Sequence, residues 1–325
     1  MNHNVAMISH SNELEILSTS HYTNSFNRGV ISNRGNKVAY DALQSGSDHE
    51  GGYLVPDSME KQIIEALTEE NIIRKLARVI HTDSCGRLVP IAEAMSDAKW
   101  MPEGEQMQLS DKTFSQAKLR MHKLGIMLRV TNELLSDAGV DMTTYIAESF
   151  ARRIALAEEN AFLNGNGITM PQGILTESGA ETGLAIQSQN SITADEIITL
   201  YYSLRAPYRK HAVFIMHDDT AKALRQMKDS NGNYIWHDAL SYDQPSIILG
   251  CPVFTSEYMP RMQAGNKPVL FGDLSFYWIA DRGNRSICRY DELYVSQGQT
   301  GFRVIERVDG RLLVPEAAKV IQMAA

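Results

Sequence analysis

One segment of the sequence constrains the fold more than any other: a long amphipathic helix that ends at a glycine. Apolar residues recur at spacings of three or four from Met142 onwards, which is the period of one helix face. Asp141 is placed to cap the first turn, and Gly165 is placed to adopt the left-handed conformation that often ends a helix. A helix from Met142 to Leu163 is roughly 33 Å long, whereas about three turns are usual. The fold must therefore accommodate a long rod.

The composition is that of an ordinary soluble globular protein. The chain has 325 residues, of which 43% are hydrophobic and 22% charged, so it can bury a large core in one or two domains. No apolar run approaches the ~18 residues of a membrane span. The N-terminus lacks the basic region and apolar core of a secretory signal. We therefore expect neither membrane insertion nor export.

The cysteines and the net charge exclude further classes. Cys85, Cys251 and Cys288 are scattered and odd in number, which favours reduced thiols over a disulfide framework or a zinc site. The net charge of −8 argues against tight binding to nucleic acid, which needs clustered Lys and Arg.

Three short motifs could be taken for chemical sites. The run His217-Asp218-Asp219 contains metal-ligand residue types, but a helix start explains Asp218 and a fourth ligand is not nearby in sequence. Asn164-Gly165-Asn166-Gly167 follows a helix and lacks the phosphate-loop pattern. Cys85 and Cys251 stand beside turn glycines without a histidine in a recognisable motif. We therefore predict no catalytic residue, cofactor or metal.

The first third of the chain contains a segment that has little to fold against. Residues 1–50 are rich in Asn, Ser, His and Gly and are predicted to be poorly ordered. Residues 94–121 have a polar middle between strand-like flanks, and Trp100 is an aromatic residue on this polar hairpin. A long two-stranded hairpin is marginal by itself. We expect it to lie on a neighbouring copy of the chain, with Trp100 as an interface residue.

Other elements of this region follow from local signals. Asp57 and Glu60 have the spacing of a capping box at a helix start. Short strands are expected on either side of the turn that ends at Gly86. The basic groups at residues 74–78 and 118–123 are predicted to be solvated faces, or contacts with acidic neighbours across a subunit boundary.

From Ile192 onwards helices and strands alternate. Thr193 and Glu196 form a capping box, and Asp218 is placed to cap a later helix. Near the end of the chain, Asp309-Gly310 is predicted to be the turn of a hairpin. Pro315 is predicted to open a short final helix.

Several ordered blocks lie along the chain, each weak alone but specific in their order and spacing. They are Gly-Gly-Tyr-Leu-Val-Pro at 51–56, the Trp100 hairpin ending at Phe114, the helix end at 158–175, Met227 to Trp236, Leu249 to Val253, Gly272 to Ser275 with Ile279 to Arg282, and Arg311 to Ala317. Together they resemble the major capsid proteins of tailed bacteriophages, which have the Hong Kong phage shell fold, and the resemblance covers roughly residues 45–325.

The resemblance implies an α+β fold with a defined division of the chain. The predicted segments are a flexible N-terminal segment at 1–50, an N-arm with the first strands at 51–93, an extended hairpin loop at 94–121, a peripheral domain with the spine helix at 122–191, an axial α/β domain at 192–285, and return strands with a C-terminal helix at 286–325. The chain departs from relatives with covalent lysine–asparagine links, because residues 298–302 contain no asparagine.

The function implied by the resemblance is structural. Identical subunits would form the pentamers and hexamers of an icosahedral shell around double-stranded DNA, in a virion assembled in the cytoplasm of a bacterial host. Implied partners are the chain itself, a scaffold or maturation protease, a portal protein and the DNA, with no membrane. We predict that the assembly interface includes Trp100, Pro102, Glu103, Phe114, Arg152 and Glu159.

Two alternatives remain. An encapsulin-like nanocompartment shell would have the same fold and enclose a cargo enzyme. An α/β enzyme built on residues 192–285 would need a nucleophile or cofactor loop, and none is recognisable in the sequence.

Overall fold

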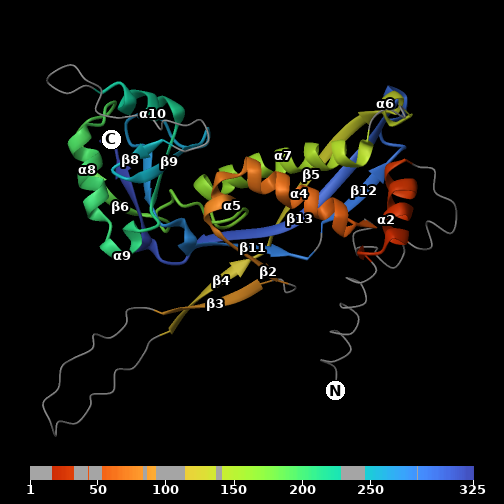
Figure 1. Ribbon diagram of the computed structural model, residues 1–325, viewed down its shortest axis with the longest axis horizontal. Coiled ribbons are helices and arrows are strands. Elements are labelled where there is room, and N and C mark those ends of the chain that lie inside the picture. Colours follow the sequence, from red (N-terminus) through yellow and green to blue (C-terminus); the bar gives the residue numbers. More distant parts are fainter. Residues whose placement is uncertain are drawn as a thin grey trace, which may run out of the picture.

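Two β-sheets lie at opposite ends of an elongated molecule, and one long helix runs along the larger end (Figure 1). The computed structural model describes residues 17–32, 43, 53–82, 86–92, 114–136, 141–227, 246–283 and 285–325. We call the part that contains the long helix the spine body and the other part the end body. Helices and strands are mixed along the chain, so the predicted α+β class is confirmed.

The spine body packs helices against a sheet whose central strand is unusually long. The helices are α4 (Asp57–Glu70), α5 (Ile72–Leu76) and α7 (Met142–Asn164), with the short α6 (Asn132–Ser136) beyond them. The sheet order is β1-β12-β13-β11-β2, and β5 also pairs with β13. The strand bounds are β1 Tyr53–Leu54, β2 Arg78–Thr82, β5 His122–Thr131, β11 Tyr277–Arg282, β12 Ser286–Tyr290 and β13 Gln299–Leu312.

Helix α7 confirms the strongest sequence prediction. Asp141 is its N-cap, and its side chain accepts hydrogen bonds from the backbone N–H groups of Thr143 and Thr144. These bonds satisfy donors that a helix start leaves without a partner. A hydrogen bond from the Thr144 hydroxyl, together with these backbone bonds, holds the pKa of Asp141 below its usual value. The apolar stripe, including Ile146 and Phe150, is buried in the spine body. Capping and periodicity together explain where this helix begins and which face is buried.

The end of α7 differs from the prediction in its geometry. Gly165 is the C-cap, but its φ of −64° and ψ of 150° are extended, not left-handed. A Cβ atom at this position would overlap the carbonyl oxygens of Ala161 and Pro171. The glycine is therefore required for close packing and not for a positive φ, which occurs at Gly167 instead.

The end body is a second six-stranded sheet within the described residues, in the order β6-β14-β10-β7-β9-β8. Helices α8 (Ala194–Ser203), α9 (Ala206–Arg209) and α10 (Asp218–Arg225) lie around it (Figure 1). At its centre Phe214 stacks on Phe271, with ring centroids 4.3 Å apart. The strand bounds are β6 Glu181–Ala185, β7 Val213–Met216, β8 Ile247–Ile248, β9 Cys251–Thr255, β10 Val269–Gly272 and β14 Ala318–Gln322.

Two helix starts in the end body test the capping predictions. The capping box of Thr193 and Glu196 at α8 is confirmed, with both reciprocal hydrogen bonds present. The prediction for α10 is wrong by one residue, because His217 is the N-cap and its Nδ1 atom accepts a hydrogen bond from the Asp219 N–H. Asp218 is the first helical residue, where its negative charge interacts favourably with the positive end of the helix dipole.

The C-terminal region contains two corrections. Asp309 and Gly310 are not a hairpin turn, because β13 continues through both and pairs with β11 across them. A Cβ atom on Gly310 would lie 2.5 Å from the Tyr277 hydroxyl and 2.9 Å from the Phe162 ring, so this glycine serves close packing. The predicted C-terminal helix is also wrong: Pro315 opens one 3-10 turn, η4 (Pro315–Ala317), and strand β14 follows.

The N-terminal segment is ordered where the structure describes it, which corrects the prediction for residues 17–32. Helix α2 (Ser20–Phe26) continues into the π-helical turn η1 (Asn27–Ile31) and packs in the core of the spine body. Tyr22, Phe26 and Val30 are buried at a spacing of four, a helical pattern visible in the sequence. Arg289 fixes the end of the segment by donating to the carbonyl oxygens of Val30 and Ile31.

The chain passes between the two bodies three times within the described residues. It crosses from α7 to β6, from β10 through the 3-10 turn η2 (Leu274–Phe276) to β11, and from β13 through η4 to β14. Sheet membership therefore does not follow the predicted segment boundaries, because β11 belongs to the spine body and β14 to the end body. One apolar cluster, which includes Phe162 of α7 and Ile215 of β7, joins both bodies.

Candidate assembly interface

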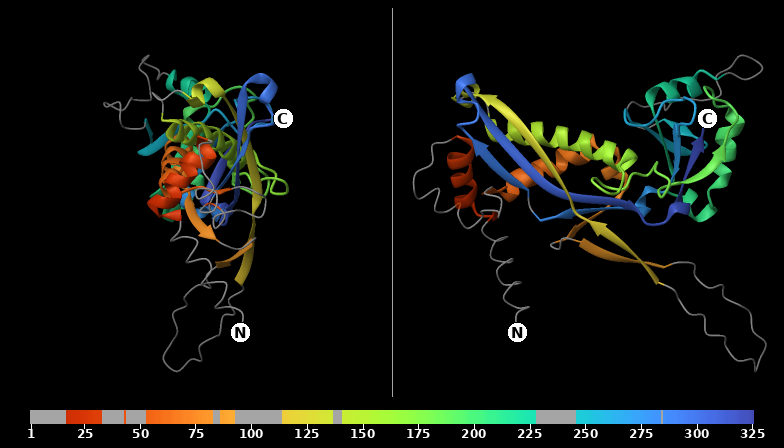
Figure 2. Two further views of the ribbon diagram at one scale, coloured as in Figure 1. Left: turned by 90° about the vertical axis from the view of Figure 1, so that its right-hand side faces the viewer. Right: turned by 180° about the vertical axis from the view of Figure 1, so that it is seen from behind.

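A two-stranded ribbon leaves the spine body at the position of the predicted extended loop. Strand β3 (Gly86–Ala92) pairs antiparallel with β4 (Phe114–Arg120), and Figure 2 shows this ribbon running obliquely away from the long axis. The predicted interface residue Phe114 begins β4. Trp100, Pro102 and Glu103 lie outside the described residues, so their interface role stays a prediction.

The base of the ribbon has one buried and one exposed face. Val89, Ala117 and Leu119 are buried together with Ala280 of β11 and with Leu313. On the opposite face Leu88 is 58% exposed and Lys118 is exposed. This alternation has the period of a strand, and it fixes the direction in which the ribbon leaves the subunit.

The ribbon is also tied to β13 through a buried carboxylate. Asp309 Oδ2 accepts a hydrogen bond of 2.6 Å from the backbone N–H of Arg120, and Asp309 Oδ1 accepts one from the N–H of Gly310. Burial raises the pKa of Asp309 to about 6, although both backbone N–H groups act in the opposite direction. His122 Nε2 lies 3.5 Å from Asp309, and burial lowers the pKa of this histidine.

A buried ion-pair group joins the end of α7 to α5 and β11. Arg74 donates two hydrogen bonds of 2.6 Å to Glu158 and two of 2.8 Å to Asp281. Burial raises the pKa of Glu158 to about 8 against the opposing effect of Arg74. The pKa of Asp281 stays below its usual value, because Arg74 outweighs the effect of burial on this carboxyl. Arg74 is therefore an internal ion-pair partner, which corrects its assignment to a solvated or intersubunit basic face.

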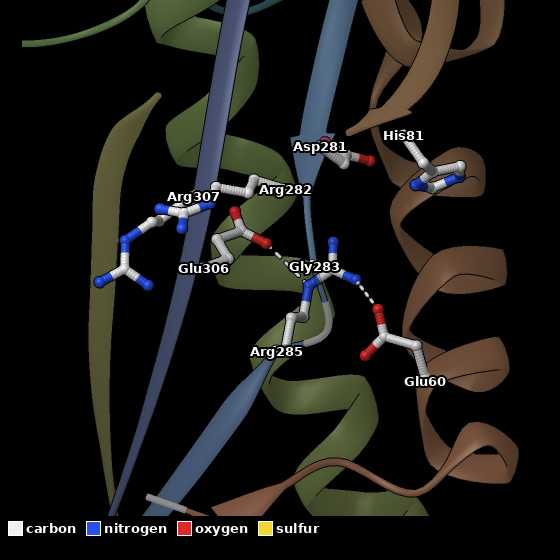
Figure 3. Close-up of a pocket in the computed structure, with 8 residues that line it drawn as sticks. All are labelled: Glu60, His81, Asp281, Arg282, Gly283, Arg285, Glu306 and Arg307. Atoms are coloured by element: carbon white, nitrogen blue, oxygen red, sulfur yellow. Dashed lines mark hydrogen bonds and ion pairs between the residues drawn. The ribbon is translucent and has the colours of Figure 1, made fainter. Parts of the chain in front are cut away.

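A second buried arginine lies between two carboxylates. Arg285 Nε donates to Glu306 at 2.7 Å, and Arg285 Nη1 donates to Glu60 (Figure 3). The residues around it line a small cavity, namely Glu60, His81, Asp281, Arg282, Gly283, Arg285, Glu306 and Arg307. Among the described residues, one oxygen of Glu60 and one of Glu306 find no hydrogen-bond partner.

The predicted capping box of Asp57 and Glu60 at the start of α4 is wrong. The helix begins after Pro56, which supplies no side-chain cap, and Asp57 lies in the first turn. The Glu60 side chain is bound to Arg285 instead. The charge-assisted contact with a buried arginine takes precedence over a bond to the local backbone.

The two remaining predicted interface residues lie in different places. Arg152 is on the outer side of α7, with 71% of its side chain exposed, and its Nε lies 3.5 Å from Glu70 of α4. Glu159 is buried: it accepts hydrogen bonds from the Ser256 hydroxyl and from the Ile72 N–H, and burial raises its pKa. Glu159 holds α7 against α5 and the loop after β9. It is not available for contact with another subunit, which corrects that prediction.

The other chemical candidates occupy structural positions. His217 caps α10, as described above. Cys251 is buried in β9, and burial raises the pKa of its thiol, which makes it a poor nucleophile. In the described ranges we find no group of three or more His, Cys, Asp or Glu side chains placed to hold a metal ion. Across those same ranges, none of the helices combines the length and apolar character needed to cross a membrane.

Comparison with known proteins identifies the family. The sequence pattern that defines the Phage capsid family matches residues 51–323. This chain belongs to the phage capsid family. The match covers both bodies and the ribbon, and it begins after the N-terminal helix α2.

Individual relatives agree with this family assignment. The major capsid protein of Klebsiella oxytoca phage phiKO2 is 22% identical over 249 residues, in a match that covers 73% of this chain and 57% of that relative. The chain thus matches a little over half the length of this curated relative.

Solved structures confirm the fold. The capsid of a native GTA particle, computed with C5 symmetry, superposes with a TM-score of 0.66 at 28% identity, covering 78% of this chain and 90% of that chain. A chain of Gordonia phage Cozz superposes with a TM-score of 0.58 at 16% identity, covering 79% and 87%. The predicted Hong Kong phage shell fold is therefore confirmed. The comparisons support a phage-type capsid protein and do not favour the nanocompartment alternative.

Proposed function

We propose that this chain is the repeating subunit of a tailed-phage or prophage shell, assembling into pentamers and hexamers around double-stranded DNA. The observation that carries the proposal is the family match over residues 51–323. A scaffold or maturation protease and a portal protein are the further proposed partners, and assembly takes place in the cytoplasm of a bacterial host. We propose no enzymatic activity.

The architecture supports an assembling subunit. The ribbon base of β3 and β4 leaves the spine body with an exposed face. Arg152 offers an exposed charge along the outer side of α7. Weak contacts of this kind become cooperative when many copies close a symmetric surface.

The direct test uses the purified 325-residue chain. We expect sedimentation velocity and electron microscopy, over a range of salt and pH, to reveal rings or closed particles. Monomers under every condition would overturn the proposal. Particles that carry a protein cargo instead of nucleic acid would favour the nanocompartment alternative.

A second test removes residues 103–110 from the extended segment. We expect the variant to stay folded by circular dichroism while shell closure is impaired, because the segment is predicted to act on a neighbouring subunit. An unfolded product would instead place this segment in the core of its own subunit.

A further inference from the structure

The outer side of α8 presents apolar side chains where a surface helix usually presents polar ones. Ile198 and Tyr202 are one helical turn apart, 40% and 66% exposed, so they form one continuous strip. The inner side of the same helix packs in the end body through Ile197 and Leu200. The apolar content of α8 thus exceeds what its own core requires.

An arginine is already oriented beside this strip. The guanidinium carbon of Arg209 lies 5.3 Å from the ring centroid of Tyr202 and 5.4 Å from that of Tyr201. Its Nε also donates a 2.8 Å hydrogen bond to the Leu204 carbonyl oxygen. Because the side chain is fixed before any partner arrives, binding costs less conformational entropy.

Further positive charge lies next to the strip. Arg205 and Lys210 are exposed, and Glu316 lies 3.2 Å from Arg205. The exposed Asp195 lies one helical turn before Ile198 on α8. Arg205, Arg209 and Lys210 outnumber these two acidic side chains. Tyrosine and arginine are the residue types that dominate binding energy at protein interfaces. We define the basic face as Ile198, Tyr202, Arg205, Arg209 and Lys210.

A surface of opposite charge lies at the other half of the same sheet. His217, Asp218 and Asp219 come directly after the end of β7, and Glu257 comes two residues after the end of β9. The side chains of Asp218, Asp219 and Glu257 are all exposed. The two strands are parallel neighbours, and the Ser256 N–H donates to the Met216 carbonyl oxygen, so these acidic residues are brought together. We define them as the acidic face.

The electrostatics of this region agree with that description. Burial has the largest effect on the pKa of Tyr258 and raises it, and the negative charges of Glu159 and Glu257 raise it further. Arg261 is a basic neighbour of the acidic face, 3.2 Å from Asp219 at the surface. Lys222, exposed and one helical turn from Asp218, is a second. Three acidic side chains against two basic ones leave the face negative.

The two faces of one subunit are separated by the end-body sheet. Helix α8 packs against β6 and β14, whereas β9 is near the opposite end of the strand order. Figure 1 places α8 and α9 at the outer end of the molecule and β9 on the side nearer α7. A contact between unlike faces closes into a ring when the rotation it repeats divides a full turn evenly, and charge complementarity selects the register.

We propose that the basic face of one subunit docks on the acidic face of the next copy in the ring. This inference rests on the proposed function and specifies which surfaces form the contact between neighbouring end bodies.

Two variants and two controls test the contact. Tyr202→Ser with Lys210→Glu disables the basic face, and Glu257→Arg disables the acidic face. Lys61→Glu and Glu177→Lys reverse exposed charges outside both faces. We expect each face variant to raise the protein concentration needed for assembly by about tenfold or more, while the controls assemble like the unmodified chain.

Mixing the two face variants separates this head-to-tail contact from other arrangements. Each variant retains one intact face, so a mixture should form pairs of twice the subunit mass and no rings, as measured by sedimentation velocity. Assembly of either face variant at the normal concentration would overturn the proposal, as would a mixture that stays monomeric. A loss caused by the basic-face variant alone would point to a different, acidic partner.

Separate control measurements test the folding of each variant and the proposed function. Circular dichroism and thermal melting check each variant, and Lys210→Glu alone repeats the test without altering the tyrosine. If the unmodified chain forms no particles, the proposed function fails. If it forms particles and both face variants do so equally well, only the assignment of these faces fails.

Discussion

The two bodies of the subunit are stabilised by different interactions. The spine body buries two arginines among carboxylates: Arg74 with Glu158 and Asp281, and Arg285 with Glu60 and Glu306. The centre of the end-body sheet is apolar, with every residue of β7 and β10 buried. Its described ion pairs include surface contacts such as Arg261 with Asp219.

This difference suggests a division of roles. Burying an ion pair costs desolvation energy, which the attraction between the charges only partly offsets, but the pair accepts few alternative geometries. Apolar packing contributes more to stability and is less directional. We interpret the spine body as the part whose geometry is fixed most strictly, since it sets the directions of α7 and of the ribbon.

The largest effect is expected from Arg74→Ala. The substitution leaves Glu158 and Asp281 buried without their partner, so we expect a loss of about 3–5 kcal/mol in the free energy of unfolding. Urea denaturation measures the change. Lys75→Ala, at the exposed neighbouring position, is the matched control and should change stability by less than about 0.5 kcal/mol. Equal effects of the two substitutions would contradict the distinction between the bodies.

The next effect is expected from Gly310→Ala. The added Cβ atom would meet the Tyr277 hydroxyl and the Phe162 ring, so we expect a loss of about 1–3 kcal/mol from overpacking. Tyr277→Phe removes the hydroxyl and should relieve part of this loss in the double variant. Strictly additive losses in urea denaturation would show that the hydroxyl is not the obstacle.

A pH-dependent effect of about 2 kcal/mol is expected from Asp309. Its pKa of about 6 in the folded chain lies above the unfolded value of 3.8, so the folded state binds the proton more tightly. The stabilisation is complete below pH 3.8 and is lost as the pH rises through about 6. Asp309→Asn should remove this slope from stability measured between pH 4 and 6.5.

The comparison for Asp309 must allow for His122, whose lowered pKa has the opposite effect in part of the same range. The difference between the unmodified chain and Asp309→Asn isolates the aspartate. A slope that is unchanged by the substitution would assign the pH dependence elsewhere.

The smallest effect is expected from Ile321→Val in β14. The side chain is fully buried in the apolar core of the end body, and the loss of one methylene group should cost about 0.5–1.5 kcal/mol. Because no titrating group is involved, the loss should be constant from pH 4 to 8 in thermal or urea denaturation. A strong pH dependence would show that the end body also depends on buried charges.

Elements with local signals could be predicted from the sequence. The start of α7 at Asp141 and the capping box at Thr193 depend on residues within one helical turn. The family blocks added the shell fold, which local patterns alone do not specify. The helical segment from Ser20 to Ile31 is not predicted, because its buried residues Tyr22, Phe26 and Val30 stand within a polar composition.

Long-range contacts explain the failures. Arg74 resembled a surface residue because its partners Glu158 and Asp281 lie 84 and 207 positions away. Asp309-Gly310 has turn composition, but packing under Tyr277 keeps it in a strand. The helix sequence alone predicts that Glu159 is exposed, whereas in the structure the loop at Ser256 covers its side chain. In each case the tertiary partner overrides the local preference.

The three passages of the chain between the two bodies have a mechanical consequence. A single linker would act as a hinge, but three connections and a shared apolar cluster resist rotation of one body against the other. A shell built from such subunits must bend mainly at the joints between them. The radius of curvature of the shell would then be set by the angles between neighbouring subunits, because each subunit behaves as one rigid body.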